Sequence, residues 1–159
     1  MSDLNNNLHK GSPLLYLRED KLKETLNNFF LVYKTFENQI LDNASVNGFG
    51  IADIRCILII LLYPGITFNE LLIKLSITKQ SLNRVLKILL EKKMVIQETN
   101  KKDKRMKNLY LSDESKKIIN NLIGPTIKEI SNAFQKSGSE AVNGFNQIFL
   151  NLAKKTNDE

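Results

Sequence analysis

The chain has 159 residues, of which 42% are apolar and 25% charged, and these proportions predict one soluble globular domain with a buried core. One cysteine and one histidine exclude an internal disulfide and an ordinary structural zinc site. The longest apolar run, residues 57–63, is shorter than the roughly 20 residues that cross a bilayer, and the N-terminus lacks a signal-peptide pattern, so we expect a cytoplasmic protein with no membrane partner.

The net charge of +6 is unevenly distributed along the chain. Residues 66–111 hold eleven basic and four acidic residues, which gives 11 − 4 = +7 and leaves 6 − 7 = −1 for the rest. A positive surface on one side is the electrostatic footprint of a protein that binds phosphate, nucleic acid above all. A solvated basic loop gives the same composition, so charge alone does not decide between the two.

The first part of the chain predicts an arm and two helices. Residues 1–17 are expected to form an N-terminal arm, followed by a single domain over 18–159. Apolar residues recur at helical spacing over about 18–43, which predicts a long first helix. Residues 51–63 are apolar nearly all round and end at Pro64-Gly65, as a buried central helix would.

The basic segment predicts a helix-turn-helix followed by a hairpin, so that a winged helix spans about 51–111. Thr67 and Glu70 form a capping box for a short helix, and Thr78 caps a second helix with one apolar and one polar face. Short β-prone runs at 94–96 and 109–111 enclose a charged turn and predict a two-stranded wing. A helix, a tight turn and a helix are a DNA-reading arrangement.

The last part, about 112–155, predicts amphipathic helices that start at a Ser112 cap. Gly124-Pro125 is expected to kink or divide the first of them, and Ser137-Gly138 to end it before a final helix. The predicted fold class is therefore mostly α: a winged helix-turn-helix with a two-stranded β wing and long N- and C-terminal helices.

The order of these parts resembles the MarR family of winged-helix transcriptional regulators over roughly residues 20–155. The resemblance is most specific at Asp103-Lys104-Arg105 before a strand and at Leu111-Ser112 before a helix, and residues 77–82 further resemble the PetP branch. It implies a homodimeric regulator, in our prediction a repressor on a pseudo-palindromic operator, with dimerisation helices at about 18–43 and 112–155. Gly124-Pro125 departs from the family by interrupting the expected long helix.

The residues that we assign to the dimer interface are apolar and lie near the two ends of the chain; internal core packing is the alternative reading. They are Leu14, Leu15, Tyr16, Leu22, Leu26, Ile127, Phe134, Phe145, Phe149 and Leu152.

Side chains of the second helix are the first candidates for contact with double-stranded DNA. A helix N-terminus attracts phosphate, so Thr78 and Lys79 would set position. Arg pairs with guanine and Asn or Gln with adenine, each worth roughly 1–3 kcal/mol of discrimination. An ordinary polar helix face is the alternative. The candidates are Thr78, Lys79, Gln80, Ser81, Asn83, Arg84 and Lys87.

The wing supplies the second group of candidates. Arg105 is expected to enter the minor groove of an A·T-rich flank, while Asp103 holds its guanidinium. An exposed ion pair of little energetic worth is the alternative. The lysines expected to contact phosphates from the wing are Lys101, Lys102, Lys104 and Lys107.

Three further hypotheses concern regulation and rival functions. The resemblance implies a small aromatic or anionic effector, for which candidate pocket residues are Tyr33, Phe36, Phe49, Arg55 and Tyr63, although core packing explains the same residues. Cys56 is expected to be a buried hydrophobe rather than an oxidant sensor. A protein-interaction module without DNA reading is the other alternative. No nucleophile–base set, metal cluster or Gly-rich phosphate loop indicates an enzyme or a cofactor.

Overall fold

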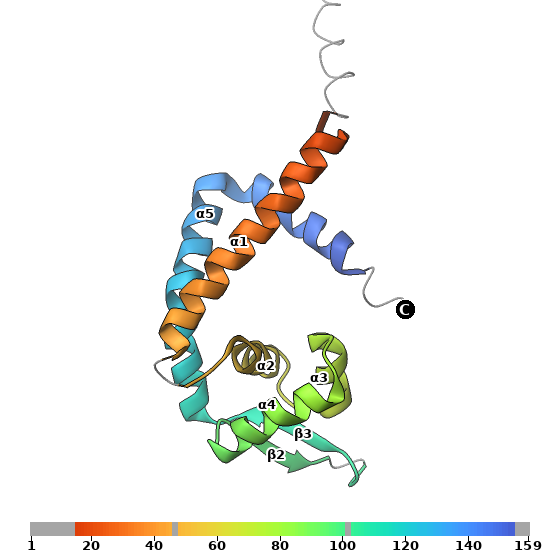
Figure 1. Ribbon diagram of the computed structural model, residues 1–159, viewed down its shortest axis with the longest axis vertical. Helices are drawn as coiled ribbons and strands as arrows, with labels where there is room; N and C mark the ends of the chain where they lie inside the picture. Colours follow the sequence, from red (N-terminus) through yellow and green to blue (C-terminus); the bar gives the residue numbers. More distant parts are fainter. Residues whose placement is uncertain (1–14, 46–47, 101–102, 155–159) are drawn as a thin grey trace, which may run out of the picture. The chain divides into compact units, whose positions relative to one another are not determined.

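The computed structural model describes residues 15–45, 48–100 and 103–154 (Figure 1). The chain divides into two compact units, of which the first ends at Gln39 and the second begins at Ile40. Helices predominate, and a three-stranded sheet lies in the second unit. The mostly α winged-helix prediction is confirmed.

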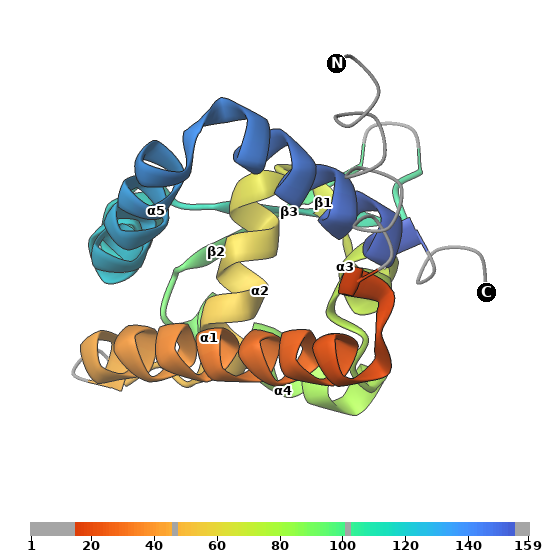
Figure 2. The same ribbon diagram turned by 90° about the horizontal axis from the view of Figure 1, so that it is seen from above.

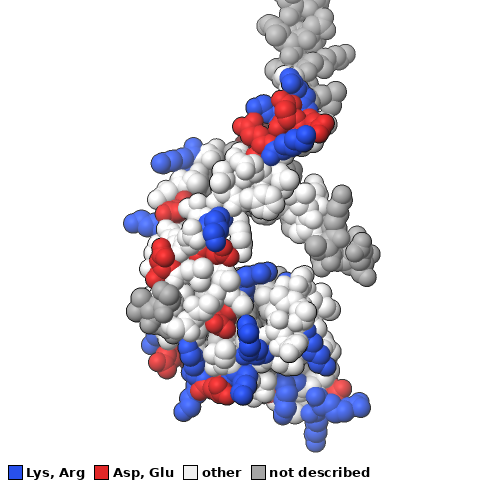
Figure 3. All heavy atoms as spheres, viewed as in Figure 1, with Lys and Arg blue, Asp and Glu red and all other residues white. Residues whose placement is uncertain are grey.

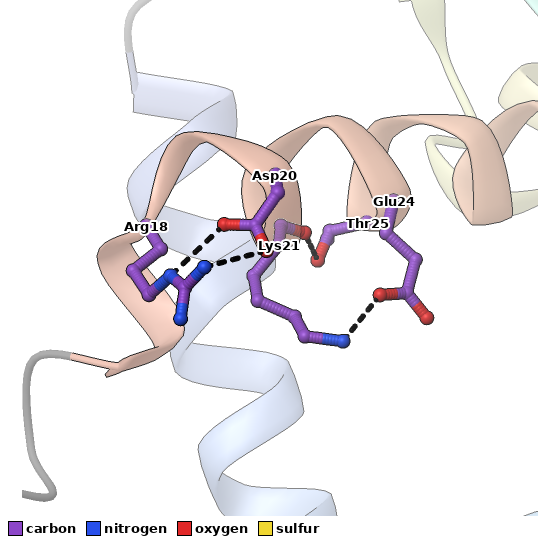
Figure 4. Close-up of polar contacts among 5 residues, drawn as sticks. All are labelled: Arg18, Asp20, Lys21, Glu24 and Thr25. Atoms are coloured by element: carbon purple, nitrogen blue, oxygen red, sulfur yellow. Dashed lines mark hydrogen bonds and ion pairs between the residues drawn. The ribbon is translucent and has the colours of Figure 1, made fainter.

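The first unit contains a short 3-10 helix, η1 (Leu15–Leu17), and most of the long helix α1 (Glu19–Ser45). Figure 4 shows the polar contacts at the start of α1, where Arg18 Nε lies 3.1 Å from Asp20 Oδ1 and Lys21 Nζ lies 2.7 Å from Glu24 Oε2. All four side chains are exposed, so these pairs stabilise the helix only slightly. The predicted first helix is confirmed.

The second unit is built around α2 (Ile51–Leu62), which is in contact with α3, α4, β3 and α5. Ile54, Ile57 and Ile60 are at most 1% exposed, because the apolar residues of α2 meet neighbours on several sides. The last turn of α1 joins this core through Ala44, which is fully buried. The predicted buried central helix is therefore present.

Two short helices follow α2, and both begin at the predicted caps. Helix α3 (Phe68–Leu75) starts at Thr67, whose N–H donates to Glu70 Oε2 at 2.8 Å. Hydrogen bonds from the Thr67 backbone and side chain lower the pKa of Glu70 below its usual value. Helix α4 (Lys79–Glu91) starts at Thr78, whose Oγ1 accepts from Ser81 N at 3.2 Å. Ser76, in the left-handed region at φ 51°, turns the chain between them.

The sheet contains one more strand than the sequence predicted. Strands β2 (Val95–Thr99) and β3 (Lys107–Leu111) form the predicted hairpin, with Val95 opposite Leu111 and Thr99 opposite Lys107. Strand β1 (Ile66–Thr67) pairs with the other edge of β3, which gives the order β1-β3-β2. A strand of two residues carries no alternation that a sequence pattern can reveal.

Helix α5 (Asp113–Lys154) is continuous where we expected an interruption and breaks where we expected an end. Gly124-Pro125 was expected to kink or divide the helix; Pro125 keeps helical backbone angles, so the predicted division is wrong. The helix continues on both sides of Pro125, although the proline removes one backbone donor. Gly138 has φ 78° and ψ 165°, and α5 changes direction along its length in Figures 1 and 2. The predicted break at Ser137-Gly138 is confirmed.

The start of α5 is fastened to the start of β2 by a buried hydroxyl. Ser115 is fully buried, and its Oγ donates to the Met94 carbonyl oxygen at 2.6 Å. Ser112 Oγ accepts from Ser115 N at 3.2 Å, so the predicted Ser112 cap is present. The wing is thereby fixed to the same core as α2.

Gly65 holds the turn between α2 and β1, and it gives a test of this packing. Its φ is +85°, its N–H donates to the Leu109 carbonyl at 2.9 Å, and an added Cβ would lie 3.0 Å from Tyr110 Oη. We expect Gly65→Ala to lower the free energy of unfolding by about 1–2 kcal/mol or more, since the left-handed conformation is strained for alanine.

Gly124→Ala is the matched control, because Gly124 is helical and an added Cβ would meet nothing within 4 Å. Alanine should leave the protein unchanged or up to about 1 kcal/mol more stable at that position. Urea unfolding at one fixed protein concentration measures both variants. Equal stability of Gly65→Ala and the unaltered protein would contradict the packing described.

Candidate DNA interface

The outward face of α4 is polar over its whole length. Leu82, Val85, Leu86 and Leu89 are buried against the core, which leaves the opposite side of the helix to solvent. The predicted DNA-contact residues on that side are all exposed: Thr78, Lys79, Gln80, Ser81, Asn83, Arg84 and Lys87. The amphipathic pattern therefore determines which α4 side chains a ligand can reach.

The first turn of α4 carries hydroxyls that are already ordered. Thr78 Oγ1 donates to Ser81 Oγ at 2.9 Å and accepts from Ser81 N, so Ser81 keeps its own hydroxyl proton for an external acceptor. Because the first N–H groups of α4 have no partner within the helix, this end favours an anion such as a phosphate. Lys79 adds a positive charge beside them.

The longer side chains of α4 extend further out. Within the described ranges, Asn83 and Arg84 have no side-chain hydrogen bond, so their donors and acceptors face solvent. Lys87 Nζ lies 4.0 Å from Glu91 Oε1, at the limit of an ion pair between two exposed side chains. Arg84 thus presents an unshared guanidinium that can pair with two acceptors at once.

The turn of the β2–β3 hairpin is shaped by Asp103. Its Oδ1 accepts from the Arg105 backbone N at 2.9 Å and lies 3.3 Å from Arg105 Nε, so one carboxylate contacts both the backbone and the guanidinium of Arg105. The Arg105 side chain is 93% exposed. Asp103 therefore orients the guanidinium without covering it.

The lysines of the wing differ in their surroundings. Lys104 is exposed at the turn, and Lys107 on β3 donates to Thr99 Oγ1 at 2.7 Å across the hairpin. Lys101 and Lys102 lie outside the described residues. Lys and Arg side chains gather around α4 and the hairpin, at the lower end of Figure 3. This concentration of charge matches the +7 of residues 66–111.

The residues assigned to a dimer interface are mostly open to solvent in the single chain. In the first unit the exposed fractions are 56% for Leu15, 63% for Tyr16, 49% for Leu22 and 54% for Leu26. Leu14 lies outside the described residues. In the second unit Phe134 is half-buried, and the exposed members are Ile127, Phe145, Phe149 and Leu152.

Three aromatic rings of α5 form a cluster within that surface. The ring centroids of Phe134 and Phe145 are 5.8 Å apart, and those of Phe145 and Phe149 are 4.4 Å apart. Contiguous exposed apolar side chains on a globular protein mark an interaction surface.

The proposed effector residues do not all come together. Phe49 precedes and Tyr63 follows α2, whose 12 residues span about 18 Å, so these two rings do not line one small cavity. Phe49 is buried beneath Lys92, while Arg55 is exposed. Tyr33 and Phe36 belong to the first unit, where Tyr33 Oη donates to Glu37 Oε1 at 2.9 Å.

Tyr63 borders a shallow hollow of about 270 Å³ that includes Glu70 and Lys74. Lys74 Nζ lies 4.0 Å from the centroid of the Tyr63 ring, a cation–π contact between residues eleven positions apart. The sequence analysis missed Lys74, because nothing in the pattern of α3 distinguishes this lysine from a solvated one.

Within the described ranges no three His, Cys, Asp or Glu side chains are placed to hold a metal ion. The same ranges contain no helix with the length and apolar character needed to pass through a bilayer.

Cys56 is fully buried on α2, and this gives a test of its reactivity. Burial, with a smaller contribution from the negative charge of Asp53, raises the pKa of the thiol to about 12. We expect a thiol reagent at pH 8 to modify the folded protein at least about a hundredfold more slowly than the urea-unfolded protein, because the thiolate is the nucleophile.

Peroxide treatment should likewise leave the DNA affinity of the unaltered protein unchanged. The DNA affinity of Cys56→Ser should not respond to peroxide either. Rapid modification in the folded state, or a peroxide response that Cys56→Ser removes, would revive the oxidant-sensor hypothesis.

Comparison with known proteins identifies the family. A family model described as the MarR family matches residues 47–106. The HTH-type transcriptional regulator PetP of Rhodobacter capsulatus is 32% identical over 141 residues, which cover 87% of this chain and 83% of PetP.

Solved structures share the fold. A MarR family transcriptional regulator from Silicibacter pomeroyi superposes with a TM-score of 0.73 at 16% identity, covering 88% of this chain and 93% of that one. Staphylococcus aureus MarR, solved with salicylate and kanamycin, gives a TM-score of 0.65 at 20% identity, covering 87% and 97%. Given the match to the family model, the identity with PetP and the shared fold, this chain belongs to the MarR family of transcriptional regulators.

Proposed function

We propose that this protein is a cytoplasmic homodimer that binds a pseudo-palindromic DNA operator and represses transcription. The observation that carries the proposal is the placement of two DNA-directed elements on one unit, the exposed polar face of α4 and the exposed Arg105 of the wing. Membership of a family of transcriptional regulators supports the same function.

In this proposal α4 enters the major groove and reads bases. Thr78, Lys79 and the free N–H groups of the first turn bind phosphates and fix the position of the helix. Arg84 pairs with guanine O6 and N7, and Asn83 or Gln80 pairs with adenine N6 and N7. Each such pair discriminates against a wrong base by roughly 1–3 kcal/mol, so two or three pairs per half-site give useful specificity.

The wing adds affinity and senses groove shape. Arg105 enters the minor groove next to the half-site, where a narrow A·T-rich groove has a more negative potential. Lys104 and Lys107 contact phosphates in this proposal, as do Lys101 and Lys102, and Lys87 does so from α4. Each neutralised phosphate releases counterions, so affinity falls steeply as salt concentration rises.

The exposed apolar surfaces of the single chain support the proposed dimer. Leu22 and Leu26 of α1 and Phe145 and Phe149 of α5 are 42–54% exposed, and a second copy of the chain would cover them. A two-fold dimer presents two copies of α4, so the operator should contain half-sites about one helical turn, or roughly 34–36 Å, apart.

An effector that releases the operator is part of the proposal. The Staphylococcus aureus relative was solved with salicylate, a small aromatic anion. Arg55 is exposed on α2 and offers a cation to such a ligand. A ligand that binds the DNA-free dimer more tightly than the DNA-bound dimer would lower the affinity for the operator, because the coupling between the two binding sites is reciprocal.

The division of labour between α4 and the wing can be tested with two substitutions. Arg84→Ala should weaken binding to the preferred sequence and relax the preference at one base position of each half-site. Arg105→Ala should weaken binding and reduce the slope of log K against log salt by about 1 for each wing that contacts DNA. The loss of affinity should be largest for duplexes with A·T-rich flanks. Fluorescence anisotropy at several salt concentrations measures both.

Lys128→Ala is the control, because Lys128 is an exposed cation on α5 that has no role in the proposed DNA interface. Its affinity and salt slope should match those of the unaltered protein. Equal losses on every sequence for Arg84→Ala and Arg105→Ala would refute the division of labour. Binding that does not depend on salt at all would instead favour a protein-interaction module.

The effector hypothesis predicts that salicylate raises the melting temperature of the free protein and weakens operator binding, because a ligand stabilises the state that it binds. Arg55→Ala should reduce both effects while leaving DNA affinity without salicylate unchanged. Thermal unfolding and anisotropy over a millimolar series provide the measurement. If neither salicylate nor related phenolic acids shift either quantity, a small aromatic effector is not the regulator.

A further inference from the structure

Side-chain hydrogen bonds connect Asn108 of β3 with the turn of the wing. Asn100 Nδ2 donates to Asn108 Oδ1 at 3.0 Å, and Asn100 Oδ1 accepts from Asp103 N at 3.1 Å. Asp103 Oδ1 in turn accepts from Arg105 N and Nε, at 2.9 and 3.3 Å. The connection therefore runs from Asn108 through Asn100 and Asp103 to Arg105.

Asn100 stands at the centre of this series. Its carboxamide donates with one end and accepts with the other, and the residue is half-buried. Its backbone N also donates to the Met106 carbonyl at 3.0 Å, and Met106 N donates to the Asp103 carbonyl at 2.9 Å. These two backbone hydrogen bonds join Asn100, Asp103 and Met106, and the Asn100 side chain adds a third contact, to the Asp103 N–H.

The anchor of the series is a residue of the central strand. Asn108 faces Glu98 of β2 and Thr67 of β1 in the sheet, and its neighbour Leu109 is 1% exposed in the core. Position 108 cannot shift without disturbing pairing on both sides. A side chain held by Asn108 is therefore held by the body of the winged helix.

We propose that Asn100 is a positioning residue for DNA binding, which links β3 to Asp103 and thereby orients Arg105 toward the minor groove. The inference rests on the proposed role of Arg105. An arginine that is 93% exposed has many rotamers to lose when it enters a groove. Holding Asp103 in place limits both the backbone and the guanidinium of Arg105 before DNA arrives, and such preorganisation strengthens binding.

The hairpin offers a matched control. Thr99 and Lys107 face each other across β2 and β3, and their side chains make one hydrogen bond of 2.7 Å that is separate from the Asn108–Asn100–Asp103–Arg105 series. Thr99→Ala removes a cross-hairpin hydrogen bond adjacent to Asn100 but leaves all bonds of that series in place.

The first experiment tests the link in the free protein. Hydrogen exchange of the Arg105 amide, followed by NMR, should accelerate about three- to tenfold in Asn100→Ala, as expected for the loss of one net hydrogen bond. Asn108→Ala should act in the same direction, and Thr99→Ala should leave this amide unchanged. An Arg105 amide that exchanges in Asn100→Ala at the unaltered rate would overturn the inference, whatever the protein binds.

The second experiment tests the consequence for DNA. Affinities for a duplex with A·T-rich flanks are measured for Asn100→Ala, Arg105→Ala and the double variant, with equal melting temperatures confirming intact folds. We expect Asn100→Ala to bind about three- to tenfold more weakly and the double variant to bind no more weakly than Arg105→Ala alone.

Losses that multiply in the double variant, or unchanged binding by Asn100→Ala, would overturn the positioning role while the proposed function stands. Unchanged binding by Arg105→Ala would remove the proposed role of Arg105 and the inference with it. The exchange experiment still reports on the link in that case, so the two failures are distinguishable.

Discussion

Burial of α2 is the constraint on which the second unit depends. Cys56, Ile57 and Ile54 have no solvent exposure, and α2 contacts α3, α4, α5 and the sheet at once. Full burial of one such apolar side chain contributes about 1.5–3 kcal/mol, so a few of them outweigh the net stability of a typical domain before chain entropy is counted. Elements that interact with DNA in our account are thus fixed by a core in which none of the buried side chains that the structure describes is charged.

The same constraint separates stability from recognition on α4. Leu82, Leu86 and Leu89 face the core, so the residues between them must face outward. Gln80, Asn83 and Arg84 can therefore change without disturbing the fold. Attachment and exposure also fall on different residues of the wing: Ser115 and Asn108 attach the wing to the core, and Arg105 stays exposed.

Local signals in the sequence predicted most of the helical framework. The caps at Thr67, Thr78 and Ser112 and the apolar periodicity of α1, α2 and α4 depend on residues three or four positions apart, which a sequence displays directly. The hairpin was predicted shorter than it is, because the polar pair Thr99 and Lys107 extends the ladder through a cross-strand contact.

Features that depend on distant residues could not be predicted. Strand β1 exists because Ile66 meets Leu109, and the link through Asn100 exists because the register of β2 and β3 brings Asn108 within reach. The cation–π contact between Lys74 and Tyr63 requires the packing of α3 on α2. At Pro125 the rule for a single residue predicted a kink or a division, and the helix continues through the proline without a division.

The central claim is that a dimer of this protein reads a specific DNA sequence with two copies of α4. Selection of bound sequences from random duplex DNA, with the purified protein at roughly physiological salt, tests it most directly, because non-specific binding is weak under those conditions. Our account predicts enrichment of a two-fold symmetric motif with half-site centres about 10 base pairs apart. A set of recovered sequences with no enriched motif would contradict it.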